Sequence, residues 1–347
     1  MRDKSIGKAC TIAMIAAAFG SLPAMSTPAA AGSFTSFDPP GSINTSVTGI
    51  DSNGDIVGLY DTQDSTEFAY ERLALSGQIV TFGIRRARAT LALGINGKGQ
   101  IVGSDQHQSG DFHCFLKKKL AKKTISCDPA SAITARGLAI NNATMIAGDF
   151  NDGINTHGFI WTEDGVIGFD APGAISTTAE SISDTGATTG PWIDADHKQH
   201  GFIRDAGGAV TEFDVPGAFF TVPVTINTAG MIAGRYEPGG NRERARVPGQ
   251  PEHSFFRDEL GNVIVFDPPG AETSEALDIN KKGIVVGQWF DAGAKRRGYQ
   301  RQRSGAIRSV DFPGAAGTIA EVINDKGQIG GIFIDADGAG HGFLFNP

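Results

Sequence analysis

The sequence predicts an all-β fold, specifically a seven-bladed β-propeller of four-stranded blades. Three observations support this prediction: a unit of about 44 residues recurs seven times, glycine is abundant at 47 of 347 residues, and the two ends hold complementary fragments of one unit. A period in the forties with four short β-like segments is typical of propeller blades. No segment has sustained helical periodicity, so we expect almost no helix. A linear β-solenoid is the alternative, although it would not require matching half-units at its ends.

Four markers define the unit. The first is an isoleucine followed by a turn residue, at Ile50, Ile95, Ile140, Ile182, Ile226, Ile279 and Ile323, with steps of 45, 45, 42, 44, 53 and 44 residues. The second is a glycine closing an apolar pair, at Gly58, Gly103, Gly148, Gly190, Gly234, Gly287 and Gly331. The third is an H-G-F slot that begins at Phe68, His113, His157, His200, His253, Arg297 and His341. The fourth is an F-D slot at Phe37, Phe82, Cys127, Phe169, Phe213, Phe266 and Val310.

The fifth unit illustrates the expected order of elements. Its four strands are predicted over Thr221–Ile226, Met231–Tyr236, Ser254–Arg257 and Val263–Phe266. Turns are expected between them because proline fixes φ and glycine permits positive φ, at Asn227–Gly230, near Gly261 and at Asp267–Gly270.

The two ends of the chain predict how the repeat closes. Ser33–Asp38 reads as an isolated fourth strand, and Gly342–Phe345 as an isolated third strand. Pairing them would complete a seventh blade and remove two exposed sheet edges, which otherwise favour aggregation. The last blade is therefore expected to be closed by the N-terminal strand.

The first 31 residues have the features of a secretory signal peptide. Arg2, Lys4 and Lys8 precede an apolar stretch, Ala9–Leu22, that is too short to cross a bilayer. Ala29–Ala31 then offers a cleavage site before Gly32. We expect a single repeat domain over 32–347, secreted to the periplasm, cell surface or extracellular space, with no transmembrane segment in the mature chain. A buried N-terminal helix is the alternative interpretation.

Composition narrows the classes of partner. Apolar residues at 40% and charged residues at 20% fit a soluble folded protein, and the formal net charge of −8 argues against nucleic acid as a ligand.

The repeat resembles the bacterial HAF-repeat family of probable extracellular repeat proteins. The resemblance covers Ser33–Pro347 and rests on the H-G-F slot, an I-N-x-x-G-x-I-x-G block and an F-D-x-P-G-A block. It implies a secreted β-protein built from repeats and brings no catalytic residues. Phe68 and Arg297 depart from the pattern by replacing the histidine, and two units lack Pro-Gly.

The recurring polar residues have structural and functional interpretations. The slot histidines could form a binding rim on one face, at His113, His157, His200, His253 and His341, although a hydrogen bond within each unit is the favoured interpretation. The F-D aspartates fit Asx-type turns, at Asp38, Asp128, Asp170, Asp214, Asp267 and Asp311. Two acidic loop types resemble fragments of calcium sites, at Asp51–Asp55 and at Asp194, Asp196, Asp335 and Asp337. They lack the glutamate at position twelve that completes an EF-hand, so we predict no cofactor beyond weak calcium binding.

The cysteines predict one disulfide. Removing the signal peptide leaves Cys114 and Cys127, which fall in the Gly slot of strand three and the Phe slot of strand four. These slots should lie opposite one another, about 4.5–5.5 Å apart at Cα, within the span of a disulfide. Two buried free thiols are the alternative.

The fifth unit carries the one large insertion, Gly239–Gly249, with Arg242, Arg244 and Arg246. We expect it to join the histidine rim as a candidate contact with a partner, although a tolerated surface insertion is the simpler interpretation. Lysines crowd one hairpin tip, at Lys117, Lys118, Lys119, Lys122 and Lys123, where a solvated turn is the default.

The function predicted from these features is a monomeric, non-catalytic extracellular or surface scaffold that binds a glycan or a protein. The alternative is a secreted propeller hydrolase or lyase that acts on glycan through carboxylates at the central mouth. Enzymes usually break their repeat symmetry at the active site, and the insertion holds no obvious acid pair, which argues against the enzyme.

Overall fold

The computed structural model describes residues 32–64, 66–119, 121, 123–239 and 251–347. These residues form an all-β structure with 29 strands and no helix. Among them, no helix is long and apolar enough to cross a membrane. The segment predicted to be a signal peptide and the arginines Arg242, Arg244 and Arg246 lie outside the described residues.

The first two sequence units share an eight-stranded sheet. Each is an antiparallel group, and a single parallel pair, Glu67 with Ala89, connects them. The strands are β2 (Asn44–Ile50), β3 (Ile56–Asp61), β4 (Glu67–Arg72) and β5 (Ile79–Phe82), then β6 (Ala89–Ile95), β7 (Ile101–Gln106), β8 (Phe112–Lys117) and β9 (Thr124–Ser126).

The third and fourth units share a nine-stranded sheet, again through one parallel pair, Thr156 with Ser176. Its strands are β10 (Thr134–Ile140), β11 (Ile146–Asn151), β12 (Thr156–Thr162) and β13 (Gly165–Phe169), then β14 (Ser176–Thr177), β15 (Ser181–Ile182), β16 (Thr188–Ile193), β17 (Gln199–Arg204) and β18 (Val210–Phe213).

Three four-stranded sheets complete the described chain. Two follow chain order, and the third takes its outer strand from the N-terminus in the order β1-β29-β28-β27. The strands are β19 (Ala218–Ile226), β20 (Ile232–Pro238), β21 (His253–Arg257) and β22 (Val263–Phe266); β23 (Ala271–Ile279), β24 (Val285–Asp291), β25 (Arg296–Arg301) and β26 (Ile307–Ser309); and β27 (Gly317–Ile323), β28 (Ile329–Ile334), β29 (Gly340–Asn346) and β1 (Ser33–Phe37). In the fifth unit the fourth strand matches its predicted bounds, while β19 starts three residues earlier than expected, at Ala218.

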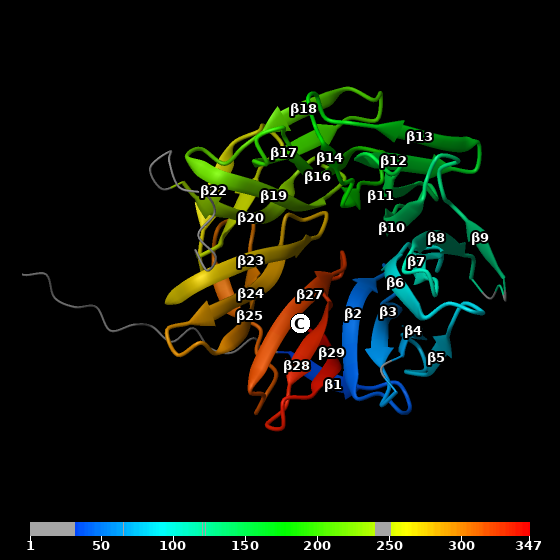
Figure 1. The fold of residues 1–347 in the computed structure, drawn as a ribbon. Helices are drawn as coiled ribbons and strands as arrows, with labels where there is room; N and C mark the ends of the chain where they lie inside the picture. Colours follow the sequence, from blue (N-terminus) through cyan, green and yellow to red (C-terminus); the bar gives the residue numbers. More distant parts are fainter. Residues whose placement is uncertain (1–31, 65, 120, 122, 240–250) are drawn as a thin grey trace, which may run out of the picture.

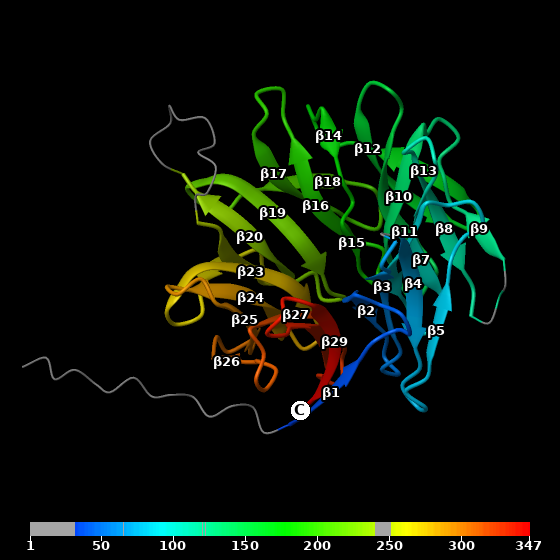
Figure 2. The same ribbon diagram turned by 60° about the horizontal axis from the view of Figure 1, so that its bottom comes forward.

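The groups are arranged as in a β-propeller. The first strands of the units, including β2, β6, β10, β19, β23 and β27, face a common centre, and β5, β9, β13, β18 and β22 lie at the periphery (Figure 1). The second view shows that β1 lies beside β29, so the two ends of the described chain meet (Figure 2).

The predicted pairing of the chain ends is confirmed. Phe34 lies opposite Phe345, and Phe37 opposite Gly342. The Phe34 ring contacts those of Phe343 and Phe345 at centroid distances of 5.5 and 4.8 Å. The N-terminal strand therefore covers what would otherwise be the free edge of β29.

The second-strand glycines have a steric cause. A Cβ on Gly58 would stand 1.9 Å from the carbonyl oxygen of Ser46, and the other six glycines of this marker would clash with the first strand in the same way, at 1.9–2.2 Å. This close approach accompanies a β-bulge in the first strand, where one residue has no partner opposite. The repeated glycine is thus the residue that admits the bulge.

The glycine of the H-G-F slot has a different cause. The phenylalanine of the F-D slot lies over it, so that a Cβ on Gly158 would meet the Phe169 ring at 2.8 Å. In the second unit Cys114 and Cys127 occupy these two positions and form the predicted disulfide, with Cα atoms 5.1 Å apart. The disulfide therefore takes the place of the Gly–Phe contact.

Candidate functional site

The histidine rim is a set of five His–Asp pairs in the propeller. In each, Nδ1 of the slot histidine contacts the carboxylate of the F-D slot at 2.8–3.0 Å: His113 with Asp128, His157 with Asp170, His200 with Asp214, His253 with Asp267, and His341 with Asp38. Arg297 replaces the histidine in the sixth unit and contacts Asp311 at 3.3 Å. The hydrogen bond within the unit, which the structural interpretation predicts, is therefore present for all five histidines.

The F-D aspartates join strands three and four of a hairpin, and this differs from the Asx-turn interpretation. Asp128 Oδ1 accepts a hydrogen bond from the backbone N–H of Cys114, and Asp311 Oδ1 from that of Gly298. The third and fourth strands pair antiparallel, so the aspartate that follows the fourth strand lies beside the histidine of the third. Its carboxylate can therefore reach the imidazole of that histidine.

In the acidic loops with calcium-like spacing, the aspartates also accept hydrogen bonds from groups within the protein. Asp194 and Asp335 each accept two backbone hydrogen bonds of their own turn through Oδ1. Through Oδ2 they contact Nε2 of His200 and His341, at 3.3 and 3.1 Å. Asp51 Oδ1 likewise accepts three backbone N–H groups. Within the described ranges, no group of three or more His, Cys, Asp or Glu side chains is placed to hold a metal ion.

These contacts affect protonation of the rim. The hydrogen bond to Asp38, reinforced by Asp335, raises the pKa of His341. Burial opposes protonation of His157, but the hydrogen bond and charge of Asp170, with Asp152, outweigh it and raise its pKa. Acid conditions therefore strengthen these two contacts.

A cavity of about 460 Å³ lies on the propeller axis, lined by first strands from all seven units. The β-bulges determine its wall, because a bulge re-aims the unpaired residue. Six bulges are register shifts within continuous strands, and in the fourth unit the irregularity is the gap between β14 and β15. The residues at this position that line the cavity are Thr48, Leu93, Leu138, Glu180, Val224, Leu277 and Glu321.

Two of these seven side chains are carboxylates, and they break the repeat. Neither Glu180 nor Glu321 makes a side-chain hydrogen bond with any described residue. Burial raises the pKa of Glu180, opposed by Arg136 and Arg235. Burial, reinforced by the charge of Glu275, raises the pKa of Glu321 to about 7. The axial wall thus holds acids whose hydrogen-bonding capacity is unused.

Two further acids near Glu321 are already engaged. Asp278 accepts hydrogen bonds from Thr225 and from the backbone N–H of Ile323, at 3.2 and 2.8 Å, so it joins three units. Burial nevertheless raises its pKa to about 6. Glu275 accepts a hydrogen bond from Gln288 Nε2 at 2.9 Å.

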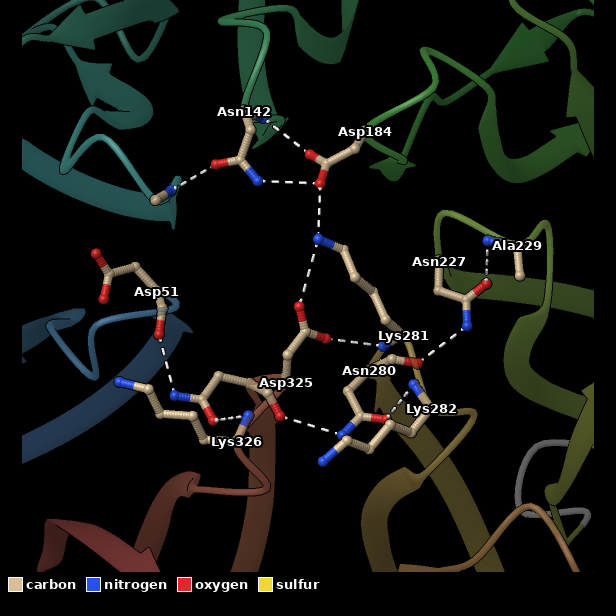
Figure 3. A network of polar contacts seen from close by, with 12 residues as sticks. Asp51, Asn142, Asp184, Asn227, Ala229, Asn280, Lys281, Lys282, Asp325 and Lys326 are labelled. Carbon is tan, nitrogen blue, oxygen red and sulfur yellow. Dashed lines mark hydrogen bonds and ion pairs between the residues drawn. The ribbon is translucent and has the colours of Figure 1, made fainter.

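The axial mouth on the face opposite the histidine rim is crossed by polar side chains (Figure 3). Lys281 Nζ reaches from the sixth unit to Asp184 of the fourth at 3.1 Å and to Asp325 of the seventh at 3.4 Å. Asn142 donates to both Asp184 oxygens at 3.0 Å. This network spans the mouth and links the third, fourth, sixth and seventh units.

The turn asparagines form a second ring at the same mouth. The side-chain Nδ2 of each donates to the equivalent backbone carbonyl of the next unit, at 2.9–3.1 Å: Asn96 to Asn141, Asn141 to Ser183, Asn227 to Asn280, Asn280 to Asn324, and Asn324 to Asp51. The last of these bonds links the seventh unit to the first.

Sequence reasoning missed Glu180 and Glu321. The available signal was the residue two positions before each marker isoleucine, which is Thr, Leu or Val in five units and Glu in the other two. The structure does not bring the histidines together as one metal-binding cluster.

No family model and no curated protein matches the chain. Among solved structures, it is similar to an acylaminoacyl peptidase from Pyrococcus horikoshii, with 11% identity and a TM-score of 0.57 over 88% of this chain and 52% of the peptidase. This chain thus spans about half of that protein. It is also similar to TolB from Acinetobacter baumannii, with 10% identity and a TM-score of 0.46 over 84% of this chain and 79% of TolB. At 11% identity the likeness to the peptidase concerns the fold alone.

Proposed function

We propose that this protein is a secreted, seven-bladed β-propeller that binds a glycan or a protein ligand in its axial cavity without catalysis. Closure as seven blades is supported by the pairing of β1 with β29 and by the hydrogen bond from Asn324 to Asp51. Secretion is supported by the signal-like N-terminus and by the disulfide, which is typical of oxidising compartments. Assignment to the HAF-repeat family remains part of this proposal and rests on the sequence markers.

The observation that carries the binding proposal is the pair of unused carboxylates at Glu180 and Glu321. A half-buried carboxylate without a partner costs stability, and a bound ligand that donates hydrogen bonds would recover that cost. Sugar hydroxyls and peptide N–H groups are such donors. The other bulge residues, mainly aliphatic, supply an apolar wall.

Titration calorimetry against a glycan and peptide panel, with and without calcium, tests this function. For any ligand that binds, E180Q and E321Q should each weaken binding by about fivefold to tenfold, the loss expected when a charged hydrogen bond is replaced by a neutral one. The control E212Q removes an exposed acid from β18 and should leave binding unchanged. Binding that none of these substitutions alters would exclude the axial cavity as the site.

The second candidate function is glycan hydrolysis, and one observation favours it. Burial and the charge of Glu275 raise the pKa of Glu321, and Glu275 itself accepts a hydrogen bond from Gln288. Glycosidases use a pair of carboxyl groups, and the one that acts as general acid has a raised pKa. Release of reducing ends from a panel glycan, abolished in both E321Q and E275Q, would establish the enzyme; binding without product release supports the scaffold.

A further inference from the structure

A groove separate from the axial cavity lies between the first two units at their outer edge. Its volume is about 990 Å³. One wall comes from the end of β4 and from β5 of the first unit, with Leu73, Leu75, Val80 and Phe82, and the other comes from the β8–β9 hairpin of the second unit. The Leu75 side chain is fully exposed. Its size and largely apolar wall fall in the range of small-molecule sites.

Three departures from the repeat coincide at this groove. The first unit has no Pro-Gly after its fourth strand, and the chain instead places Ile84 and Arg85 along the groove. The β8–β9 hairpin carries the lysine cluster. The disulfide from Cys114 to Cys127 fixes the base of that same hairpin. Sequence features that the repeat does not require therefore converge on this one groove, from both of its walls.

The charges of the groove are mostly positive. Lys119 contacts Asp55 at 3.5 Å and Lys117 contacts Glu71 at 3.9 Å, both across the boundary between the units. Arg85 and Lys123 also line the groove, and neither forms an ion pair with any described residue. A groove with two uncompensated cations stands out on a protein with a formal charge of −8.

We propose that this groove binds an amphipathic organic anion, with an alkyl body along the Leu73–Phe82 wall and an acidic head group at Arg85 and Lys123. The apolar wall shields the body from water, and the two cations supply charge complementarity for the head group. This site is independent of the axial cavity and of the ligand proposed for it.

Calorimetry with dodecanoate below its micellar concentration tests the proposal on the full mature chain. We expect saturable 1:1 binding that weakens as salt is added, because exposed charges are screened. Dodecyltrimethylammonium, which has the same alkyl length and the opposite charge, should not saturate the site. The double substitution R85Q/K123Q should weaken dodecanoate binding about tenfold, and L75Q about fivefold.

Two matched controls come from the chain itself. Lys118 lies on the same hairpin but contacts Glu163 of the third unit at 2.8 Å, so K118Q should leave the affinity within about twofold of the wild type. Leu260 is an exposed leucine in the equivalent turn of the fifth unit, away from the groove, so L260Q should behave in the same way. Absence of saturable binding, equal binding of the cationic detergent, or equal losses in the controls would overturn the proposal.

Discussion

The histidine rim and the axial wall repeat with the same period, but their polar side chains differ in what they contact. Along the rim, a histidine or arginine meets an aspartate in six units, and the contact stays within a hairpin or joins β1 to β29. On the axial wall the bulge position changes from Thr, Leu or Val to glutamate in two units, where neither carboxylate makes a side-chain hydrogen bond with a described residue. A polar residue that recurs with its partner indicates architecture, whereas one that replaces an apolar residue in a repeat is the better candidate for function.

The largest expected effect comes from removing the strand that completes the rim. A chain that starts at Asp38 would lose β1 and expose the edge of β29. Removing the buried Phe37 ring alone should cost about 3–5 kcal/mol, and losing the partly buried Phe34 ring adds to this, so the total is comparable to the whole stability of many domains. We expect aggregation or loss of cooperative unfolding, measured by circular dichroism on heating. Adding the missing segment as a peptide should restore the transition if pairing with β29 is the cause; no rescue would contradict that assignment.

The next effect concerns the second unit, where a disulfide holds the rim hairpin. C114A/C127A should lower the free energy of unfolding by about 3 kcal/mol in the chain-entropy model, or by less if the unfolded chain retains structure. The variant C114G/C127F restores the residues found in the β12–β13 hairpin and should recover part of the loss, because Phe would again cover Gly. Denaturant unfolding measures both. Equal stability of the two variants would show that the Gly–Phe contact contributes little.

A smaller effect, a gain in stability rather than a loss, is expected for a substitution on the axial wall. The Glu321 carboxyl titrates near 7 in the folded chain and at a lower pH when unfolded, so the folded state holds more protons between these values. Stability therefore falls as pH rises through that window, and E321Q avoids the loss. We expect E321Q to exceed wild-type stability at pH 8 by on the order of 1–2 kcal/mol and to match it near pH 4. The exposed-acid control E212Q should show no such gain, and a destabilised E321Q at pH 8 would mean that the carboxylate is satisfied.

Much of the fold followed from the sequence because its markers have local physical causes. The second-strand glycine admits the first-strand bulge, the turn asparagine bonds the next unit, and Cys114 lies opposite Cys127 because Gly158 lies opposite Phe169 in the third unit. The axial acids were missed because a bulge interrupts the two-residue alternation of side chains. That alternation is what allows the face of the sheet on which a residue lies to be predicted from the sequence. The outer groove was missed because it depends on how two units pack, and no single repeat encodes that.

The smallest effect is expected at the rim, for the His341–Asp38 pair that joins the two ends of the described chain. The hydrogen bond to Asp38 raises the pKa of His341, so its contribution to stability is fully present below the unfolded value near 6.5 and is lost as pH rises through the folded value. H341Q should therefore be less stable than the wild type at pH 5, by about 1 kcal/mol or less for this partly exposed pair, and the difference should fade by pH 8 to 9.

Denaturant unfolding across that pH range measures the effect, with H197N as the control. His197 is an exposed histidine outside the rim slot, and asparagine tolerates its left-handed backbone at φ 61°. The two variants should therefore differ from the wild type in opposite directions: H341Q is less stable at acid pH, whereas E321Q is more stable at basic pH. A loss in H341Q that did not vary with pH would assign the role of this histidine to its stacking on Phe333, whose ring centroid lies 4.9 Å away, rather than to its charge.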